Sequence, residues 1–572
     1  MPPGRRARHL QLAECVGVAL VLAALTAIVT WPQAAVLTTH AHEHHDALFS
    51  MWRLSWIAEA LAHQPTRLFD APIFHPELRT LAYSDAVLLQ GLVATPALLA
   101  GAPILPTYNL LLLAGPWLSA LGTYLLIRSL LLPVDDDGAA TRAHGNRTAA
   151  NGPAVWWPAL IGAVIFGLLP YRLEHIMHLE LQWSQWMPLS CWALHRTVRR
   201  GRIADGVLTA VFVLCQFLSC IYYGIFLVLV LAAAAPWLLL TRQRAALRRI
   251  AVAVIVGAVL TGPILVAYSA PYRANQQAFG GRAAWEIDTW SARPGSFLAA
   301  PPENRLYGAA TASFGAPEGR LFPGVIAIVL AVVGLVTARA RRETWMYAAA
   351  LVTSSLLSLG TSTPVYGAML AVAPPLRGLR APARFGMLVA LAIAVLAGLG
   401  AAALLSRLPR RRWRHAAGAL VVVGLTMEYA TAVGPLRAWP QRAPLYAMWL
   451  RLQPRGVVIE FPVPRAWALP NFDAEWSYLG RFHGQPLVNG YSGYYPKSYL
   501  DLLNSVITFP RGESVDALRA RGVRYVVVHE NRYKPADFLD FDGRLRRTPG
   551  LRPAGYFPDV AYPAVVFTLE PR

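Results

Sequence analysis

A series of long apolar segments with few charged residues most strongly constrains how this chain folds. The first segment, near residues 13–31, is long enough to cross a bilayer, and many more follow. Charged residues make up only 15% of the chain, whereas a soluble globular protein carries about 25%. These segments predict an integral membrane protein and argue strongly against a water-soluble enzyme.

Arginine clusters between the apolar segments predict their orientation, because loops rich in Arg and Lys stay on the cytoplasmic side. The five clusters are Arg5/Arg6/Arg8, Arg196/Arg199/Arg200/Arg202, Arg242/Arg244/Arg248/Arg249, Arg339/Arg341/Arg342 and Arg407/Arg410/Arg411/Arg412/Arg414. With all five inside, we expect eleven spans, a cytoplasmic amino terminus and an outer carboxyl-terminal tail. The spans are expected near 13–31, 107–130, 156–170, 183–198, 205–220, 222–240, 249–269, 321–338, 344–360, 384–406 and 415–433.

Two other interpretations of the basic residues are weaker. A formal net charge of +21 could indicate nucleic-acid binding, but the arginines lie between apolar segments, as topology determinants do. No nucleic-acid partner is expected. The basic start followed by an apolar stretch also fits a secretory signal, but the many later spans favour an uncleaved first span.

The segment 86–102 is apolar but short, with Pro96 inside it and Pro103 after it. If it crossed the membrane, the four later arginine clusters would lie on the outer side. We therefore expect a helix at the outer membrane surface.

The tail after residue 433 has a different pattern. Val457–Phe461 and Val523–Val528 are rich in β-branched residues and predict buried strands. Ser514–Arg521 predicts a helix, with Ser514 as its cap and Gly522 at its end. The predicted fold class is a membrane all-α domain, 1–433, with interfacial helices in its outer loop 32–106. A small α/β domain, 434–572, follows outside the membrane.

The first outer loop opens with four histidines and Asp46, followed by an amphipathic stretch, Ala47–His63. Trp52 and Trp56 could anchor this stretch at headgroup depth. A helix dipole stabilises a carboxylate at a helix start, which makes Asp46 a candidate reactive group. An ordinary capping role for Asp46 stays open.

The second outer loop, 171–182, carries His175, His178 and Glu180. Helical spacing would put the two histidines on one face. Ionisable residues near a membrane are costly and are functional candidates for that reason. The alternative is a solvated turn between two spans.

Several motifs and the loop layout resemble one family of membrane enzymes. The motifs are Leu68-Phe69-Asp70-Ala71-Pro72-Ile73-Phe74-His75-Pro76, Leu81-Ala82-Tyr83-Ser84, Gly378-Leu379-Arg380-Ala381-Pro382-Ala383-Arg384-Phe385 and Leu487-Val488-Asn489-Gly490-Tyr491-Ser492-Gly493. With the acidic outer loops, they resemble the GT-C membrane glycosyltransferases, and more narrowly a set of poorly characterised bacterial GT-C-like membrane proteins. The resemblance implies a polyprenyl-phosphate-linked sugar donor and transfer on the outer face. It also implies that Asp46 is the general base or orients the acceptor, and that Glu180 helps to bind acceptor or metal, assisted by His178.

The donor's phosphate needs cationic partners. Arg377, Arg380 and Arg384 precede the tenth span on the predicted outer side, and arginine forks bind phosphate bidentately. Anchoring of these arginines to lipid headgroups is the alternative. Further candidates for contact with the acceptor are His45, His175 and Asp85.

A metal site is a weaker hypothesis. Imidazole and carboxylate are suitable ligands for a divalent metal ion, so His42, His44 and His45 are candidates. The same stretch could equally be a polar loop. The resemblance leaves the metal requirement open, because paired acidic motifs of the family are replaced here by histidines.

The resemblance therefore implies a glycosyltransferase, and the strong bias for arginine over lysine predicts a bacterial inner membrane. Its expected partners are membrane lipids, a polyprenyl-phosphate-sugar donor and a glycan, lipid or protein acceptor. A non-catalytic accessory protein of cell-envelope polysaccharide assembly on the same scaffold is the alternative. A transporter is less favoured, because no internal repeat is visible.

Overall fold

The computed structural model describes residues 3–132, 153–240 and 242–571. They form two compact units, each assembled from separate stretches of chain. Unit 1 contains the described residues of 1–36, 110–269 and 280–434, and unit 2 contains those of 37–109, 270–279 and 435–572. These units are defined by how compactly the chain packs and not by which residues lie in a membrane. The predicted boundary between a membrane domain, 1–433, and an outer domain, 434–572, therefore stays a prediction.

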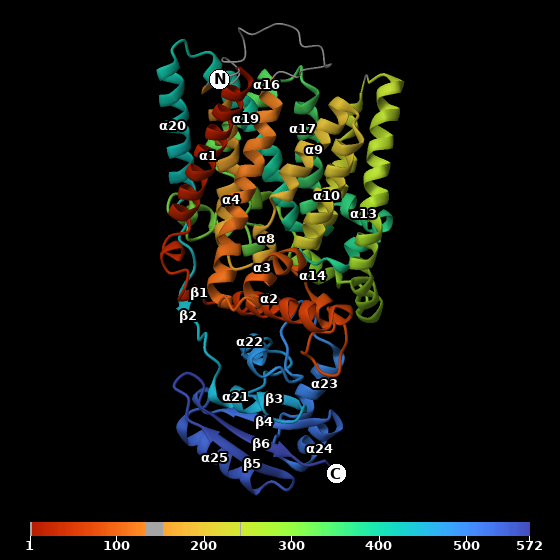
Figure 1. The fold of residues 1–572 in the computed structure, drawn as a ribbon, viewed down its shortest axis with the longest axis vertical. Coiled ribbons are helices and arrows are strands. Elements are labelled where there is room, and N and C mark those ends of the chain that lie inside the picture. Colours follow the sequence, from red (N-terminus) through yellow and green to blue (C-terminus); the bar gives the residue numbers. More distant parts are fainter. Residues whose placement is uncertain (1–2, 133–152, 241, 572) are drawn as a thin grey trace. The chain divides into compact units, whose positions relative to one another are not determined.

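Unit 1 consists mainly of helices, most of them gathered into a bundle (Figure 1). Its longer helices are α1 (Pro3–Val29), α4 (Ile104–Leu131, from residue 110), α6 (Pro153–Leu168), α9 (Trp186–Arg200), α10 (Ile203–Ser219), α11 (Ile221–Ala234), α13 (Arg244–Phe279, up to residue 269), α16 (Val325–Thr337), α17 (Arg342–Ser358), α19 (Gly386–Ser406) and α20 (Arg411–Glu428). Shorter helices are α7 (Pro170–Glu174), α8 (Leu179–Gln182), α12 (Pro236–Leu239), α14 (Ala284–Thr289), α15 (Gly308–Thr311) and α18 (Pro364–Val372).

Each of the eleven predicted spans coincides with a helix. Among the described residues, five helical segments are long and apolar enough to cross a membrane: Ile104–Leu131, Val155–Glu174, Ile221–Leu239, Arg244–Phe279 and Pro382–Ser406. Three of the other predicted spans fall on shorter apolar helices, at Ala13–Val29, Ile203–Ser219 and Val325–Thr337. The predicted membrane protein is confirmed, whereas the count of eleven spans stays a prediction.

Helix α19 lies at the centre of unit 1. Almost every side chain from Gly386 to Ala401 is buried, and α19 packs against α6, α16 and α17. Gly400 faces α16 so closely that a Cβ there would overlap the Leu330 carbonyl, and Gly334 meets the Leu396 carbonyl in the same way. Small residues at such crossings let two helix backbones approach, so a side chain at either glycine would force α16 and α19 apart.

Arginines of two predicted clusters lie together in unit 1. Arg199 donates from Nη1 to the Ser129 carbonyl at 3.1 Å and pairs through Nη2 with Glu343 at 3.0 Å. Arg341 donates to the Leu130 carbonyl at 2.5 Å. The carboxyl ends of α4 and α9 therefore meet the turn between α16 and α17, so both clusters share one end of the bundle, as their assignment to one side of the membrane requires.

Unit 2 combines helices with two small sheets. Its helices are α2 (His45–His63), α3 (Leu88–Leu99), α21 (Leu445–Arg451), α22 (Asp473–His483), α23 (Lys497–Ser505), α24 (Gly512–Ala520) and α25 (Pro535–Arg547). Its strands are β1 (His40–His42), β2 (Leu436–Ala438), β3 (Val457–Phe461), β4 (Val523–His529), β5 (Leu551–Phe557) and β6 (Ala564–Leu569). Strands β1 and β2 pair antiparallel, so the first outer loop is hydrogen-bonded to the start of the tail.

The second sheet has the order β3-β4-β6-β5, in which β3 and β4 run parallel and the other neighbours antiparallel. Both predicted strands are therefore confirmed, and so is the helix before β4. Ser514 is not its cap, because α24 begins at Gly512 with Arg511 in the capping position. Gly522 ends the segment with a φ of 70°, the left-handed conformation that favours glycine.

Helix α2 packs against α3 and α22 within unit 2. Trp52 and Trp56 are therefore buried instead of facing lipid headgroups, and Trp56 donates from Nε1 to the Leu68 carbonyl at 2.8 Å. Helix α3 occupies the segment predicted to lie at the membrane surface. Its 12 residues extend roughly 18 Å, which is short of the roughly 30 Å hydrocarbon core.

Glu460 on β3 is a fully buried carboxylate in unit 2. Its Oε2 accepts from the Tyr446 hydroxyl at 3.0 Å and lies 2.6 Å from His529 Nε2, while Oε1 is 3.5 Å from His483 Nε2. Burial alone would raise the pKa of Glu460, but the two histidines lower it to about 2. This charge cluster joins β3 to β4 and α22.

Asp473, the first residue of α22, is buried without a cationic partner among the contacts that the structure describes. Its oxygens accept from the Tyr499 hydroxyl at 2.9 and 2.8 Å, and from Asn489 Nδ2 at 3.3 Å. Burial raises the pKa of Asp473 to about 8, although the bonds from Tyr499 and Asn489 act in the opposite direction. The folded chain therefore holds this carboxyl protonated at neutral pH.

Asp473→Asn is expected to make the folded protein less sensitive to pH. The ordinary pKa of 3.8 in the unfolded chain is below the folded value of about 8, so the folded form binds the proton more tightly. The contribution of Asp473 to stability is therefore largest below pH 3.8 and falls by about 1.4 kcal/mol per pH unit until about pH 8. Melting temperatures of the full-length protein in detergent should fall less steeply with pH in the Asn variant. Equal slopes for both proteins would show that Asp473 does not titrate in this range.

Candidate functional site

The predicted topology leaves three segments on the outer side between spans, at 171–182, 270–320 and 361–383. These outer segments contact one another within unit 1, the middle one through its residues from 280 onward. The Arg282 amide donates to the Arg377 carbonyl at 2.8 Å, and the Ala383 amide donates to the Trp290 carbonyl at 3.2 Å. Arg320 forms an ion pair with Glu174. Because these links join segments far apart in sequence, they build one polar region at one end of the helices.

Glu318 is the central carboxylate of this region. It lies in the short 3-10 turn Pro317–Gly319, and its Oε1 forms an ion pair with Nε of Arg384. Its Oε2 lies 3.2 Å from His175 Nε2, and Oε1 accepts from the Tyr171 hydroxyl at 3.4 Å. The side chains of Glu318 and Arg384 are only 8% and 12% exposed, so the pair is shielded from water.

The surroundings of Glu318 keep it ionised. Burial alone would raise its pKa, but the positive charge of Arg384 and the neighbouring His175 lower the pKa to about 2. The Arg384 guanidinium also lies 4.9 Å from the centre of the Tyr222 ring, a cation–π geometry. Arg384 is therefore held in one position by a carboxylate and an aromatic face.

The structure brings together three of the predicted residues, His175, His178 and Arg384, and adds Glu318. The centres of the His175 and His178 rings are 5.8 Å apart. They do not share a continuous helix as their spacing predicted, because α7 ends at Glu174 and α8 begins at Leu179. Glu180 is buried in α8, but the carboxylate beside Arg384 and His175 is Glu318.

The other two predicted phosphate ligands have different surroundings from Arg384. Arg377 is exposed, and its Nε donates to the Leu370 carbonyl at 3.2 Å. Arg380 is 38% exposed, and its Nη1 is 3.7 Å from Glu286 Oε1. Both guanidinium groups are therefore more accessible than that of Arg384.

Asp46 belongs to unit 2 and lies in the first turn of α2. Its Oδ1 accepts from the Tyr491 hydroxyl at 3.1 Å, and its Oδ2 is 3.2 Å from His44 Nδ1. His44 is the capping residue, because its ring accepts from the Asp46 amide at 3.2 Å. The capping interpretation of Asp46 is therefore wrong. Its carboxylate, 16% exposed, is held at the helix start by the motif that contains Tyr491.

Of the remaining predicted residues of unit 2, His42 and His45 lie at or just before the start of α2, whereas Asp85 contacts Arg53 farther along the helix. The His45 ring lies 5.8 Å from the Tyr491 ring, and burial lowers the pKa of His45. Burial of His42 lowers its pKa to about 4. Asp85 is buried, and its backbone carbonyl accepts from Arg53 Nη1 at 2.5 Å.

The described part of the chain contains no clear set of ligands for a metal ion. No three His, Cys, Asp or Glu side chains there are grouped so that they could hold one. The candidates His42, His44 and His45 thus do not form such a group with one another or with Asp46.

The chain shares its fold with a solved oligosaccharyltransferase, which agrees with the fold that the resemblance predicted. A matching structure is the oligosaccharyltransferase AglB from Archaeoglobus fulgidus in complex with an inhibitory peptide and a dolichol-phosphate. The TM-score is 0.50 at 14% identity, and the match covers 92% of this chain and 70% of AglB. This likeness establishes the fold and does not by itself establish the reaction.

A second similar structure is ArnT from Cupriavidus metallidurans bound to undecaprenyl phosphate, with a TM-score of 0.46 and 13% identity over 98% of this chain and 99% of ArnT. No family model and no curated protein matches the sequence.

Sequence reasoning missed Glu318. It lies in the predicted outer segment 270–320, in which the sequence indicates no candidate residue. The only available signal was a carboxylate between a proline and a glycine in that segment, and this pattern does not indicate a contact with His175, 143 residues away.

Proposed function

We propose that this protein is a membrane glycosyltransferase that moves a sugar from a polyprenyl-phosphate-linked donor to an acceptor on the outer face of the membrane. The observation that carries the proposal is the buried cluster of Glu318, Arg384 and His175, formed where three outer segments meet in a GT-C fold. A buried charged cluster costs free energy, so it is a candidate functional site. The dolichol-phosphate bound to AglB supports a polyprenyl carrier.

Each group has a defined part in the proposed reaction. The acceptor hydroxyl must lose a proton as it attacks the anomeric carbon, and Asp46 is the proposed base. The leaving lipid phosphate gains negative charge as its bond to the sugar breaks. Arg377 and Arg380 are its proposed ligands, because their guanidinium groups are accessible.

The buried residues have supporting parts. Glu318 fixes Arg384, whose positive charge stabilises the developing phosphate charge. His178 and Glu180 are proposed to help to bind the acceptor, with His45, His175 and Asp85 as further contacts. The proposed location is a bacterial inner membrane, with the amino terminus in the cytoplasm and this site outside.

Arg380→Gln tests the phosphate assignment. A charge-assisted hydrogen bond contributes about 1.5–3 kcal/mol, so the KM for the lipid donor should rise about tenfold or more. The assay measures transfer of labelled sugar from a polyprenyl-phosphate donor by wild-type and variant proteins in liposomes. Arg293→Gln is the matched control, because Arg293 is 50% exposed and pairs with Asp288. If the KM of Arg380→Gln is no higher than that of the control, Arg380 does not bind the donor. If the wild-type protein transfers sugar to none of the acceptors supplied, the proposed enzyme activity is wrong.

A further inference from the structure

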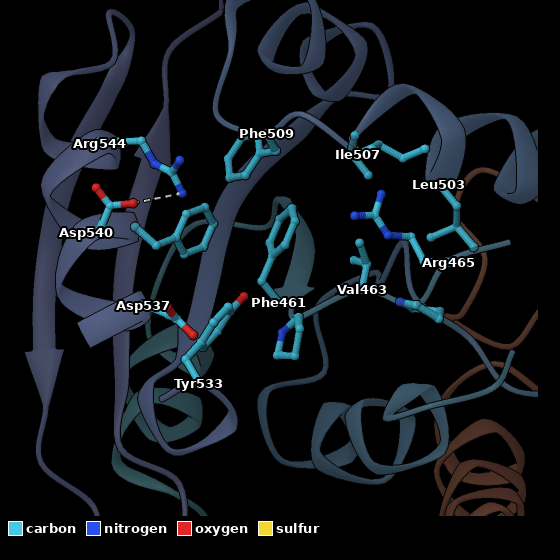
Figure 2. Close-up of a pocket in the computed structure, with 14 residues that line it drawn as sticks. Phe461, Val463, Arg465, Leu503, Ile507, Phe509, Tyr533, Asp537, Asp540 and Arg544 are labelled. Atoms are coloured by element: carbon cyan, nitrogen blue, oxygen red, sulfur yellow. Dashed lines mark ion pairs between the residues drawn. The ribbon is translucent and has the colours of Figure 1, made fainter. Parts of the chain in front are cut away.

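A cavity of about 370 Å³ lies in unit 2, and none of its lining residues belongs to the site proposed above. It is formed by the end of β3 and the loop after it, α23 and its following turn, and one side of α25 with the residue Tyr533 before it. Figure 2 shows the residues that line it. Its volume falls within the range of small-molecule sites, about 300–1,000 Å³.

One wall of the cavity is aromatic. The Phe461 and Phe509 rings stack with centres 4.6 Å apart at an angle of 13°. Phe541 meets Phe509 edge-on at 6.1 Å, and Tyr533 lies 5.5 Å from Phe541. Phe461, Phe509 and Phe541 are only 4%, 7% and 7% exposed, so they pack mainly against one another and give the cavity a fixed apolar wall. A ligand can contact this wall without ordering the side chains.

Charged groups of both signs border this surface. Arg544 pairs with Asp540 at 3.3 Å, and Asp537 is exposed one helical turn earlier on α25. On the other side, the exposed guanidinium of Arg465 points back toward the rings (Figure 2). Two carboxylates and two guanidinium groups give a border with no net charge, which favours a neutral ligand over a phosphate or another anion.

We propose that this cavity binds a neutral saccharide unit of the acceptor glycan, an inference that rests on the proposed glycosyltransferase function. A sugar ring has an apolar face of C–H groups that can lie against the aromatic rings, and an edge of hydroxyl groups. Carboxylates accept hydrogen bonds from hydroxyl groups and guanidinium groups donate to them, so both borders of the cavity engage the same ring. Trp467, two residues after Arg465, is 87% exposed and offers a further stacking surface for a longer glycan.

Binding is tested by saturation-transfer NMR on the full-length protein in nanodiscs. The probes are neutral disaccharides of glucose, galactose and mannose, with a glucuronic acid disaccharide as the charged comparison. We expect saturation transfer to at least one neutral disaccharide, and weaker binding of the acidic one. No signal from any neutral probe at millimolar concentration, or tighter binding of the acidic one, would overturn the proposal.

Variants locate the binding. Arg465→Gln and Asp537→Asn should each raise the Kd for the disaccharide about tenfold, which is equivalent to about 1.4 kcal/mol of binding free energy. The matched controls are Arg552→Gln and Asp501→Asn, which make the same substitutions at residues that do not line the cavity. Both control variants should bind the disaccharide as tightly as the wild type does. Unchanged binding in both cavity variants would contradict the assignment.

Glu318→Gln separates this inference from the proposed reaction. The variant should lose sugar transfer but keep disaccharide binding, because Glu318 is not among the cavity residues. Binding by a wild-type protein that transfers no sugar would refute the enzyme and leave a saccharide-binding cavity. Transfer without disaccharide binding would refute the cavity alone.

Discussion

Glu318→Gln is expected to destabilise the protein by about 3–5 kcal/mol and to abolish most sugar transfer. The substitution leaves the Arg384 guanidinium in a site that is only 12% exposed, without the charge that compensates it. Unfolding of full-length protein in detergent, followed by circular dichroism, measures the first effect. Asp288→Asn is the control, because its pair with Arg293 is about half exposed and should contribute little to stability.

The pH dependence gives this prediction a second readout. The pKa of Glu318 lies near 2 in the folded chain, below its ordinary 4.5. Its contribution to stability is therefore complete above pH 4.5 and is lost as the pH falls toward 2. The stability of the Glu318→Gln variant should not show this loss between pH 4.5 and pH 2. The double variant Glu318→Gln with Arg384→Gln should regain much of the stability but not the activity, and strictly additive effects would show that the two residues are not coupled.

Asp46→Asn is expected to reduce sugar transfer by about 10² to 10⁴, the usual contribution of a general base. Asparagine keeps an oxygen that can accept from the Tyr491 hydroxyl, so the start of α2 should keep its structure. The measurement is the rate of transfer in liposomes at saturating donor. A near wild-type rate would remove Asp46 from the chemistry.

Two further variants sharpen the test of Asp46. Glu43→Gln, on an exposed carboxylate three residues earlier, should leave the rate unchanged. Tyr491→Phe removes one hydrogen bond to Asp46 but no reacting group, so a smaller fall, about tenfold, is expected from this positioning residue. A fall as large as that of Asp46→Asn would indicate that Tyr491 itself takes part in the reaction.

The predictions that succeeded depend on local patterns. The runs Val457–Phe461 and Val523–Val528 were correctly identified as strands, because a buried strand needs β-branched residues over a short stretch. Apolar length likewise identified the segments that form the long helices. Each of these signals is contained in a few neighbouring residues.

The predictions that failed depend on contacts between distant parts of the chain. Trp52 and Trp56 have an interfacial pattern, but both are buried in the fold. Glu318 lies 66 residues from Arg384 and 143 from His175, and only packing brings them together. The sequence could therefore indicate which outer segments carry ionisable groups, but not which carboxylate would meet the arginine.

The discontinuous make-up of unit 2 has a consequence for biosynthesis. Residues 37–109 and 435–572 belong to one compact unit, and more than three hundred residues are translated between the two stretches. At roughly 5–20 residues per second, β1 and α2 wait for several tens of seconds before β2 and α22 emerge. During that interval the side of α2 that packs against α22 has no partner to cover it.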